Sequence, residues 1–108
     1  MQKYPVRTSA RAQLNVDALA HLCETHFERS DRDGAAVRTT WGALATLKVW
    51  PEGKELAVEL TMNPQVDAAT QAETIRRYNE FLHEATGYSA KERASRLRKS
   101  ATKSAGGA

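Results

Sequence analysis

The 108-residue sequence predicts one α+β domain, in which a curved antiparallel sheet of about four strands carries two helices on one face. Three observations lead to this fold class. Large apolar residues occupy every second position over residues 55–62, and two longer segments, 15–27 and 67–86, repeat apolar residues every three or four positions. Short strand patterns between these segments are separated by Gly, Pro and Asp-Gly turn signals. The length suits a single domain with its own core.

The first predicted strand starts near Tyr4, where Tyr4, Val6 and Thr8 alternate with other residues. Because Pro5 has no amide hydrogen to donate to a neighbouring strand, this strand belongs at a sheet edge. Asn15 is then a suitable N-cap for a helix, since its side chain can accept a hydrogen bond from the first turn. The apolar face of that helix consists of Val16, Leu19, Leu22, Cys23 and Phe27.

The central part of the chain predicts strands joined by short turns. "DRDG" (31–34) ends in Asp-Gly, which favours a tight turn, and introduces the strand "AAVRTTW". Trp41 and Gly42 interrupt this strand as a bend or bulge, and the period of two resumes in "ATLKVW". "PEGK" (51–54) is a further turn, and "ELAVELTM" (55–62) is the clearest strand. A sheet with one apolar and one polar face is expected to be antiparallel and covered on one side only.

A second helix and its end are marked by capping residues. Asp67 is the expected N-cap of a long helix, and Gly87 is the expected left-handed stop, with Tyr88 folding back on the last turn. Ser89 and Glu92 match the capping box S-x-x-E, so a further helix is expected to begin almost at once. The stripe of the long helix consists of Ala68, Ala72, Ile75, Tyr78, Leu82 and Ala85.

The predicted order β-α-β-β-β-α is similar in outline to one repeat of a TATA-binding-protein-like fold. A ferredoxin-like βαββαβ order is the main competitor, but no strand pattern follows the long helix. We therefore expect an α+β core domain at residues 1–88, a basic C-terminal helix at 89–100 and a flexible tail at 101–108.

Charge is divided unevenly along the chain. Residues 1–86 hold 10 Lys and Arg against 12 Asp and Glu, a balance of −2, whereas residues 87–108 hold 6 against 1, a balance of +5. A concentrated positive charge favours an anionic partner, and phosphate backbones are the commonest one. The nucleic-acid contacts predicted from this balance are Lys91, Arg93, Arg96, Arg98, Lys99 and Lys103, with Arg76 and Arg77 as secondary contacts. The competing interpretation is a solvated helix whose cations only favour its dipole.

A protein-interaction or homodimerising module is the alternative function. The last helix has a narrow stripe of Ala and Leu that includes Leu97, and Trp50 lies at the end of a strand, so both are candidates for a contact surface. In this interpretation the basic residues only keep the helix soluble. Small-molecule binding between the sheet and the helices is a third interpretation, which requires a cavity.

Other functions find no support in the residue patterns. His21, Cys23 and His26 are zinc-ligand types, but on a helix His21 points away from His26 and no second ligand cluster exists in the sequence. No general acid and base, and no activated nucleophile, can be identified, so we expect no enzyme activity and no cofactor. No apolar run approaches the roughly 20 residues of a membrane span. With a single cysteine, the chain is expected in a reducing cytoplasm, without a membrane partner.

Four segments together resemble a family of small, uncharacterised archaeal proteins: "WGAL", "VWPEGKELAVE", "MNPQV" and "TIRRYNEFLHEATGYSAKERASRLRK". The run YNEFL..ATGY..KER followed by a basic end is the most specific part of the resemblance, which covers most of residues 36–100. The resemblance implies an archaeal, cytoplasmic α/β domain without an established activity or cofactor, and it supplies no catalytic residue.

Overall fold

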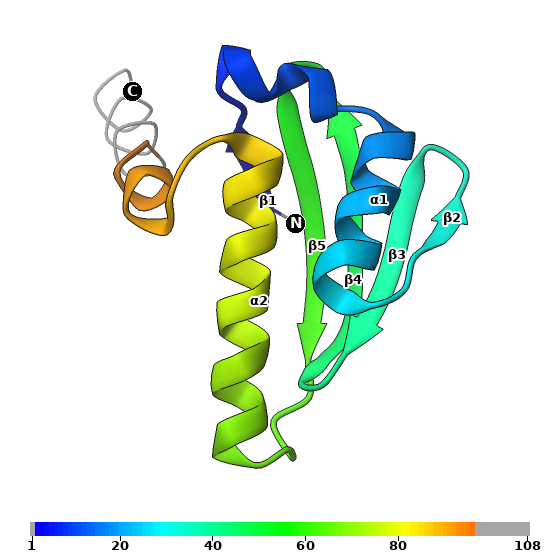
Figure 1. The fold of residues 1–108 in the computed structure, drawn as a ribbon, viewed down its shortest axis with the longest axis vertical. Helices are drawn as coiled ribbons and strands as arrows, with labels where there is room; N and C mark the ends of the chain where they lie inside the picture. Colours follow the sequence, from blue (N-terminus) through cyan, green and yellow to red (C-terminus); the bar gives the residue numbers. More distant parts are fainter. Residues whose placement is uncertain (1, 97–108) are drawn as a thin grey trace, which may run out of the picture.

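The computed structural model describes residues 2–96, which form a five-stranded antiparallel sheet in the order β1-β5-β4-β3-β2 (Figure 1). Two α-helices and one 3-10 helix complete the core domain. A further stretch of helix, residues 90–96, follows α2 and is called the basic helix below. The elements are β1 (Gln2–Pro5), η1 (Thr8–Gln13), α1 (Val16–Phe27), β2 (Asp31–Asp33), β3 (Ala36–Trp41), β4 (Leu44–Glu52), β5 (Glu55–Met62) and α2 (Ala68–Thr86).

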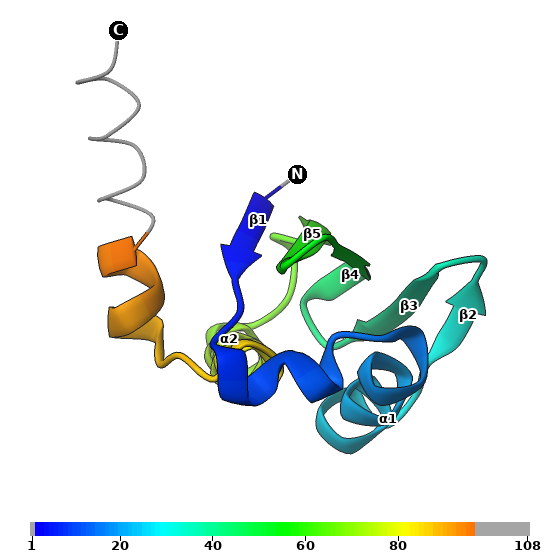
Figure 2. The ribbon, with the colours of Figure 1, turned by 90° about the horizontal axis from the view of Figure 1, so that it is seen from above.

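The sheet and the helices make two layers. Both α1 and α2 lie on the same side of the sheet, and no helix among the described residues covers its other face (Figure 2). Successive residues of a strand point to opposite faces of the sheet, so every second side chain of each strand faces the helices. Fully buried residues of the core include Leu19, Phe27, Val37, Leu47, Val49, Leu56, Phe81 and Leu82. This arrangement confirms the predicted α+β class, with an open, one-sided antiparallel sheet.

The sheet has five strands instead of about four because the first of two tight hairpins adds a short strand. Asp33 pairs with Ala36 across Gly34, so the short strand β2 precedes β3 where only a turn was expected. Trp41 pairs with Leu44 across Gly42 and Ala43, so the expected interruption is a two-residue hairpin, and the register also shifts between Thr39 and Trp41, as at a β-bulge. Both glycines have positive φ, which hairpins of this length require.

The β3–β4 hairpin is fixed to α2 at its tip. Thr74 Oγ1 accepts a 3.0 Å hydrogen bond from the amide of Ala43 and donates to the carbonyl of Thr70 at 2.7 Å. A Cβ atom on Gly42 would lie 2.7 Å from Thr74 Oγ1, closer than non-bonded atoms can approach. Gly42 therefore serves both the turn and this close contact with the helix.

The predicted first strand is shorter than expected. β1 ends at Pro5, and residues from Thr8 onward turn into the 3-10 helix η1, which buries Ala10. The capping predictions are confirmed: Asn15 Oδ1 accepts from Ala18 N at 2.8 Å, and Asp67 Oδ2 accepts from Thr70 N at 3.2 Å. None of the helices within residues 2–96 is both long and apolar enough to cross a membrane.

Candidate nucleic-acid interface

The basic helix is separated from α2 by two caps. Gly87 ends α2 with φ of 79°, and its amide donates to His83 O at 2.8 Å. Ser89 N then donates to Glu92 Oε1 at 3.0 Å, while Glu92 N donates to Ser89 Oγ at 3.3 Å. This reciprocal pair is the predicted capping box, and it redirects the chain at once into the basic helix. The helix lies beside β1 and the last turns of α2 (Figures 1 and 2).

Arg93 is buried against the core domain. Its side chain is 4% exposed, and the guanidinium donates to Tyr88 O at 2.7 Å and to Asn79 Oδ1 at 3.1 Å. The guanidinium carbon also lies 6.0 Å from the ring centroid of Tyr4 on β1. Burial lowers the pKa of Arg93 from its ordinary value, although an arginine stays charged. This corrects the expected role of Arg93, which holds the helix in place and does not face a ligand.

Arg7 makes a second connection between the domain and the basic segment. Its Nη2 donates to Glu92 Oε2 at 3.0 Å, and its Nε donates to Gly87 O at 3.1 Å. Hydrogen bonds from the backbone and side chain of Ser89, with a smaller contribution from Arg7, hold the pKa of Glu92 below its usual range. Glu92 is the one acidic residue of the segment 87–108. Its charge is balanced by Arg7, which belongs to the core domain.

Two predicted contacts remain on the surface of the described part of the basic helix. Lys91 and Arg96 are exposed, and neither has a carboxylate within ion-pair distance among residues 2–96. The guanidinium of Arg96 lies 4.2 Å from the centroid of the Tyr88 ring, which supports it as a cation–π contact. The predicted residues Leu97, Arg98, Lys99 and Lys103 lie outside the described residues.

The two secondary contacts predicted on α2 are engaged in other interactions. Arg76 is exposed but forms ion pairs with both Glu73 and Glu80. Arg77 stacks on the ring of Trp41 at 4.2 Å and donates to His26 O at 3.0 Å. Arg77 is therefore a structural link between α2, α1 and β3, and neither arginine presents an unopposed charge.

Trp50 lies half-buried on the sheet face without helices. Its indole nitrogen donates to Glu52 Oε2 at 3.3 Å, and the Lys48 ammonium lies 5.7 Å from its ring centroid. Glu52 also pairs with Lys3 at 2.9 Å, and this hydrogen bond lowers the pKa of Glu52. Ala57 on β5 is the register partner of Trp50, and it is fully buried although it belongs to the same face of the sheet. Trp50 is thus integrated into the sheet surface and is not an isolated protruding anchor.

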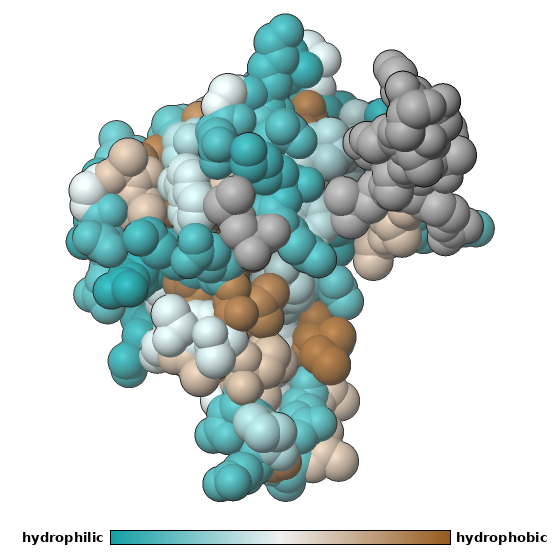
Figure 3. Space-filling view, turned by 180° about the vertical axis from the view of Figure 1, so that it is seen from behind, coloured by the Kyte–Doolittle hydropathy of each residue, from teal (hydrophilic) through white to brown (hydrophobic). Residues whose placement is uncertain are grey.

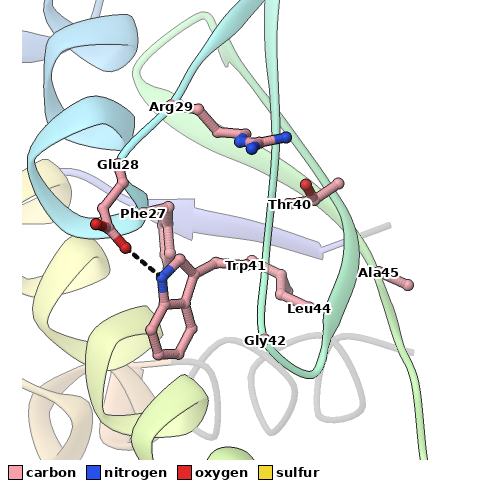
Figure 4. Close-up of a pocket in the computed structure, with 8 residues that line it drawn as sticks. All are labelled: Phe27, Glu28, Arg29, Thr40, Trp41, Gly42, Leu44 and Ala45. Carbon is pink, nitrogen blue, oxygen red and sulfur yellow. Dashed lines mark hydrogen bonds between the residues drawn. The ribbon is translucent and has the colours of Figure 1, made fainter.

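Sequence reasoning missed a hollow of about 630 Å³ beside Trp41 (Figure 4). Trp41 Nε1 donates to Glu28 Oε2 at 2.8 Å, and Figure 4 shows Arg29 extending from the neighbouring loop toward Thr40. Glu28 has φ of 67°, a left-handed conformation that is uncommon outside glycine. The sequence carries only a weak signal for this hollow. The hollow forms where the end of α1 meets the β3–β4 hairpin, and no local sequence pattern predicts that these two segments lie together.

The "HLCETH" segment belongs to helix packing. His21 is exposed, whereas His26 is buried and packs edge-on against Phe81, with ring centroids 6.2 Å apart. The Nε2 atom of His26 lies 3.3 Å from Glu84 Oε2 without forming a well-directed hydrogen bond. Burial raises the pKa of Cys23 to about 12, so its thiol is not activated. Within residues 2–96, no three His, Cys, Asp or Glu side chains are grouped to hold a metal ion.

Comparison with known proteins agrees with the fold and the suspected family. The hypothetical protein TA0095 from Thermoplasma acidophilum, solved by NMR in solution, superposes with a TM-score of 0.67 at 23% sequence identity. The alignment covers 90% of this chain and 97% of that protein, so the two share their fold. No curated protein matches the sequence. The model of a domain of unknown function, DUF5611, matches residues 1–99, and the chain belongs to this family.

Proposed function

We propose that this protein is a non-enzymatic, cytoplasmic nucleic-acid-associated protein that contacts phosphate backbones through its basic C-terminal segment. The contacting residues are Lys91 and Arg96, together with Arg98, Lys99 and Lys103 from the sequence beyond the described part. Duplex DNA is the expected partner, bound without base recognition in the manner of a chromatin protein.

The observation that carries the proposal is the way in which the basic helix is held. Arg93 and the capping box fix it against α2 and β1, and Arg7 balances the charge of Glu92. The helix therefore presents Lys91 and Arg96 from a defined position instead of from a freely moving tail. A fixed cation loses less conformational entropy on binding a phosphate than a mobile one.

Binding to duplex DNA and to RNA over a salt series tests the proposal. Each phosphate engaged contributes about −0.9 to the slope of log K against log salt on duplex DNA. We expect the double variant Lys91→Ala/Arg96→Ala to bind more weakly and to have a slope shallower by about 1.8.

The matched control is Arg29→Ala/Lys54→Ala, which removes the same charge from exposed positions away from the basic helix. We expect this control to keep the wild-type slope. The proposal is wrong if wild-type protein does not bind at low salt, or if both double variants reduce the slope equally. Tighter binding to RNA than to duplex DNA at the same salt concentration would make RNA the preferred partner.

A further inference from the structure

The hollow beside Trp41 is large enough to hold a small ligand. Its volume of about 630 Å³ lies within the range of pockets that bind small molecules. One wall is formed by residues 27–29, at the end of α1 and in the loop after it, and the other by residues 40–42, 44 and 45 of the β3–β4 hairpin (Figure 4). No described residue of the basic helix lines the hollow, so it is separate from the proposed nucleic-acid interface.

The Trp41 side chain offers this hollow an aromatic ring in a fixed position. The guanidinium carbon of Arg77 lies 4.2 Å from the ring centroid and covers one face, while the indole nitrogen donates to Glu28 Oε2 at 2.8 Å. The residue is still partly exposed, and no aromatic ring within residues 2–96 stacks on it. A ring that is already held in place can stack on a planar ligand with little further loss of conformational entropy.

Two side chains of opposite charge border the same hollow. Glu28 uses Oε2 to accept from Trp41, and no donor within residues 2–96 reaches its Oε1, so this oxygen can accept from a ligand. Arg29 is exposed, and its guanidinium forms no ion pair with a carboxylate of the described residues. Figure 4 shows the Glu28 carboxylate turned toward the indole and the Arg29 guanidinium extended away from it toward Thr40. The acceptor and the cation therefore lie at separate points on the rim of the hollow.

The backbone at Glu28 has a conformation that favours a different residue type. Its φ of 67° lies in the left-handed region, where helices most often end with glycine. At this position α1 has instead a residue whose carboxylate reaches Trp41. The loop that follows is anchored, because Thr39 Oγ1 donates to the carbonyl of Arg29 at 2.8 Å. Residues other than glycine in this region are concentrated at functional sites, so the carboxylate of Glu28 is a candidate ligand-binding group.

We propose that the hollow binds a free mononucleotide, whose base stacks on the face of Trp41 opposite Arg77. N–H groups on the edge of the base donate to Glu28, and the phosphate is held by the guanidinium of Arg29 and the hydroxyl of Thr40. A nucleotide carries its phosphate and the N–H groups of its base at opposite ends, as the separate positions of Arg29 and Glu28 require.

Simpler ligands match the hollow less well. Inorganic phosphate would leave the ring of Trp41 unused and would lie near the negative charge of Glu28. An aromatic amino acid carries its ammonium and its carboxylate on the same carbon, whereas the Glu28 and Arg29 side chains point in different directions (Figure 4). Bases in duplex DNA are paired and stacked on their neighbours, so they cannot reach Trp41. The site therefore takes a single nucleotide, and Arg29 contributes nothing to the binding of duplex DNA.

Titration of the full chain with guanosine monophosphate, followed by NMR of the indole N–H groups, tests the proposal. Guanine is the probe because its ring N–H and its amino group are neighbouring donors that suit a carboxylate. We expect the Trp41 signal to shift and the Trp50 signal, whose N–H donates to Glu52 elsewhere on the sheet, to stay in place. Inorganic phosphate alone should shift neither signal. The proposal is overturned if the Trp41 signal does not move at millimolar nucleotide, or if phosphate alone moves it equally.

Calorimetric titration of variants tests the role of each charged group. Arg29→Ala should bind guanosine monophosphate at least about tenfold more weakly but bind guanosine like the wild type, because Arg29 contacts only the phosphate. Arg11→Ala removes the same charge from an exposed position on η1 and should change neither affinity. Glu28→Gly should weaken the binding of both ligands at least about tenfold, and glycine suits φ of 67° at this position.

Circular dichroism verifies that each of these variants is folded. The proposal is also overturned if Arg29→Ala and Arg11→Ala bind the nucleotide equally well, or if Glu28→Gly binds it like the wild type. The basic helix enters none of these measurements, and Lys91→Ala/Arg96→Ala should bind the nucleotide like the wild type. The nucleotide site and the proposed nucleic-acid interface are therefore tested separately.

Discussion

Replacing Arg93 by alanine is the sharpest test of how the basic helix is attached. In the folded protein this side chain bridges the Tyr88 carbonyl, 2.7 Å away, and the Asn79 side chain, 3.1 Å away. Arg93→Ala removes both hydrogen bonds and leaves the Tyr88 carbonyl with only the longer 3.4 Å bond from Thr86 Oγ1. It also removes the contact between the guanidinium and the Tyr4 ring.

The size of the effect follows from two opposing contributions. Hydrogen bonds from a charged donor contribute about 1.5–3 kcal/mol each, so the two bonds are worth about 3–6 kcal/mol before any cost. Burying a cation costs several kcal/mol, and no carboxylate among residues 2–96 forms an ion pair with Arg93. We therefore expect Arg93→Ala to lower the free energy of unfolding by about 2–3 kcal/mol.

Urea denaturation measures the global loss, and amide hydrogen exchange of residues 90–96 measures whether the helix detaches. Lys91→Ala is the control, since an exposed side chain on the same helix should change stability by less than about 0.5 kcal/mol. If Arg93→Ala loses no more than this control and exchange over residues 90–96 is unchanged, the bridging role is refuted.

Three further variants or probes test the packing and the caps. Gly42→Ala should lose at least about 2 kcal/mol in urea denaturation because φ is 53° and the new Cβ meets Thr74, whereas Gly53→Ala, with φ of 61° in open space, should lose about 1 kcal/mol. Hydrogen bonds from Thr70 lower the pKa of Asp67 in the folded protein below its usual value of 3.8. The contribution of Asp67 to stability is therefore complete above pH 3.8 and disappears as the pH falls through the pKa of the folded state. As the pH is lowered, thermal stability should therefore fall less for Asp67→Asn, which keeps a cap, than for the wild type. Equal losses of stability in the two proteins would contradict this. Cys23, with a pKa of about 12, should resist thiol reagents in native protein at mildly alkaline pH and react once urea unfolds it, and rapid native labelling would disprove its burial.

The sequence by itself determined the features that depend on neighbouring residues. The caps at Asn15, Asp67 and Gly87 and the capping box that begins at Ser89 are all where the residue types place them, because each requires only a side chain and backbone groups within a few positions. The apolar period of two in β5 likewise indicated the one-sided sheet. The strand count was less accurate, since residues 31–33 match a turn pattern and are recognised as a strand only when they are seen to pair with β3.

Only the tertiary structure decided which charges are free. Arg93 and Arg96 look alike in the sequence, yet one is buried against Asn79 and the other is exposed on the ring of Tyr88. Arg7 reaches Glu92 across 85 positions of the chain, a distance over which no local pattern carries information. Within residues 2–96, β1 pairs only with Glu55 to Val58 of β5, and no local pattern predicts this register. The physical reason is that composition counts charged and apolar groups, whereas their availability depends on contacts made by distant segments.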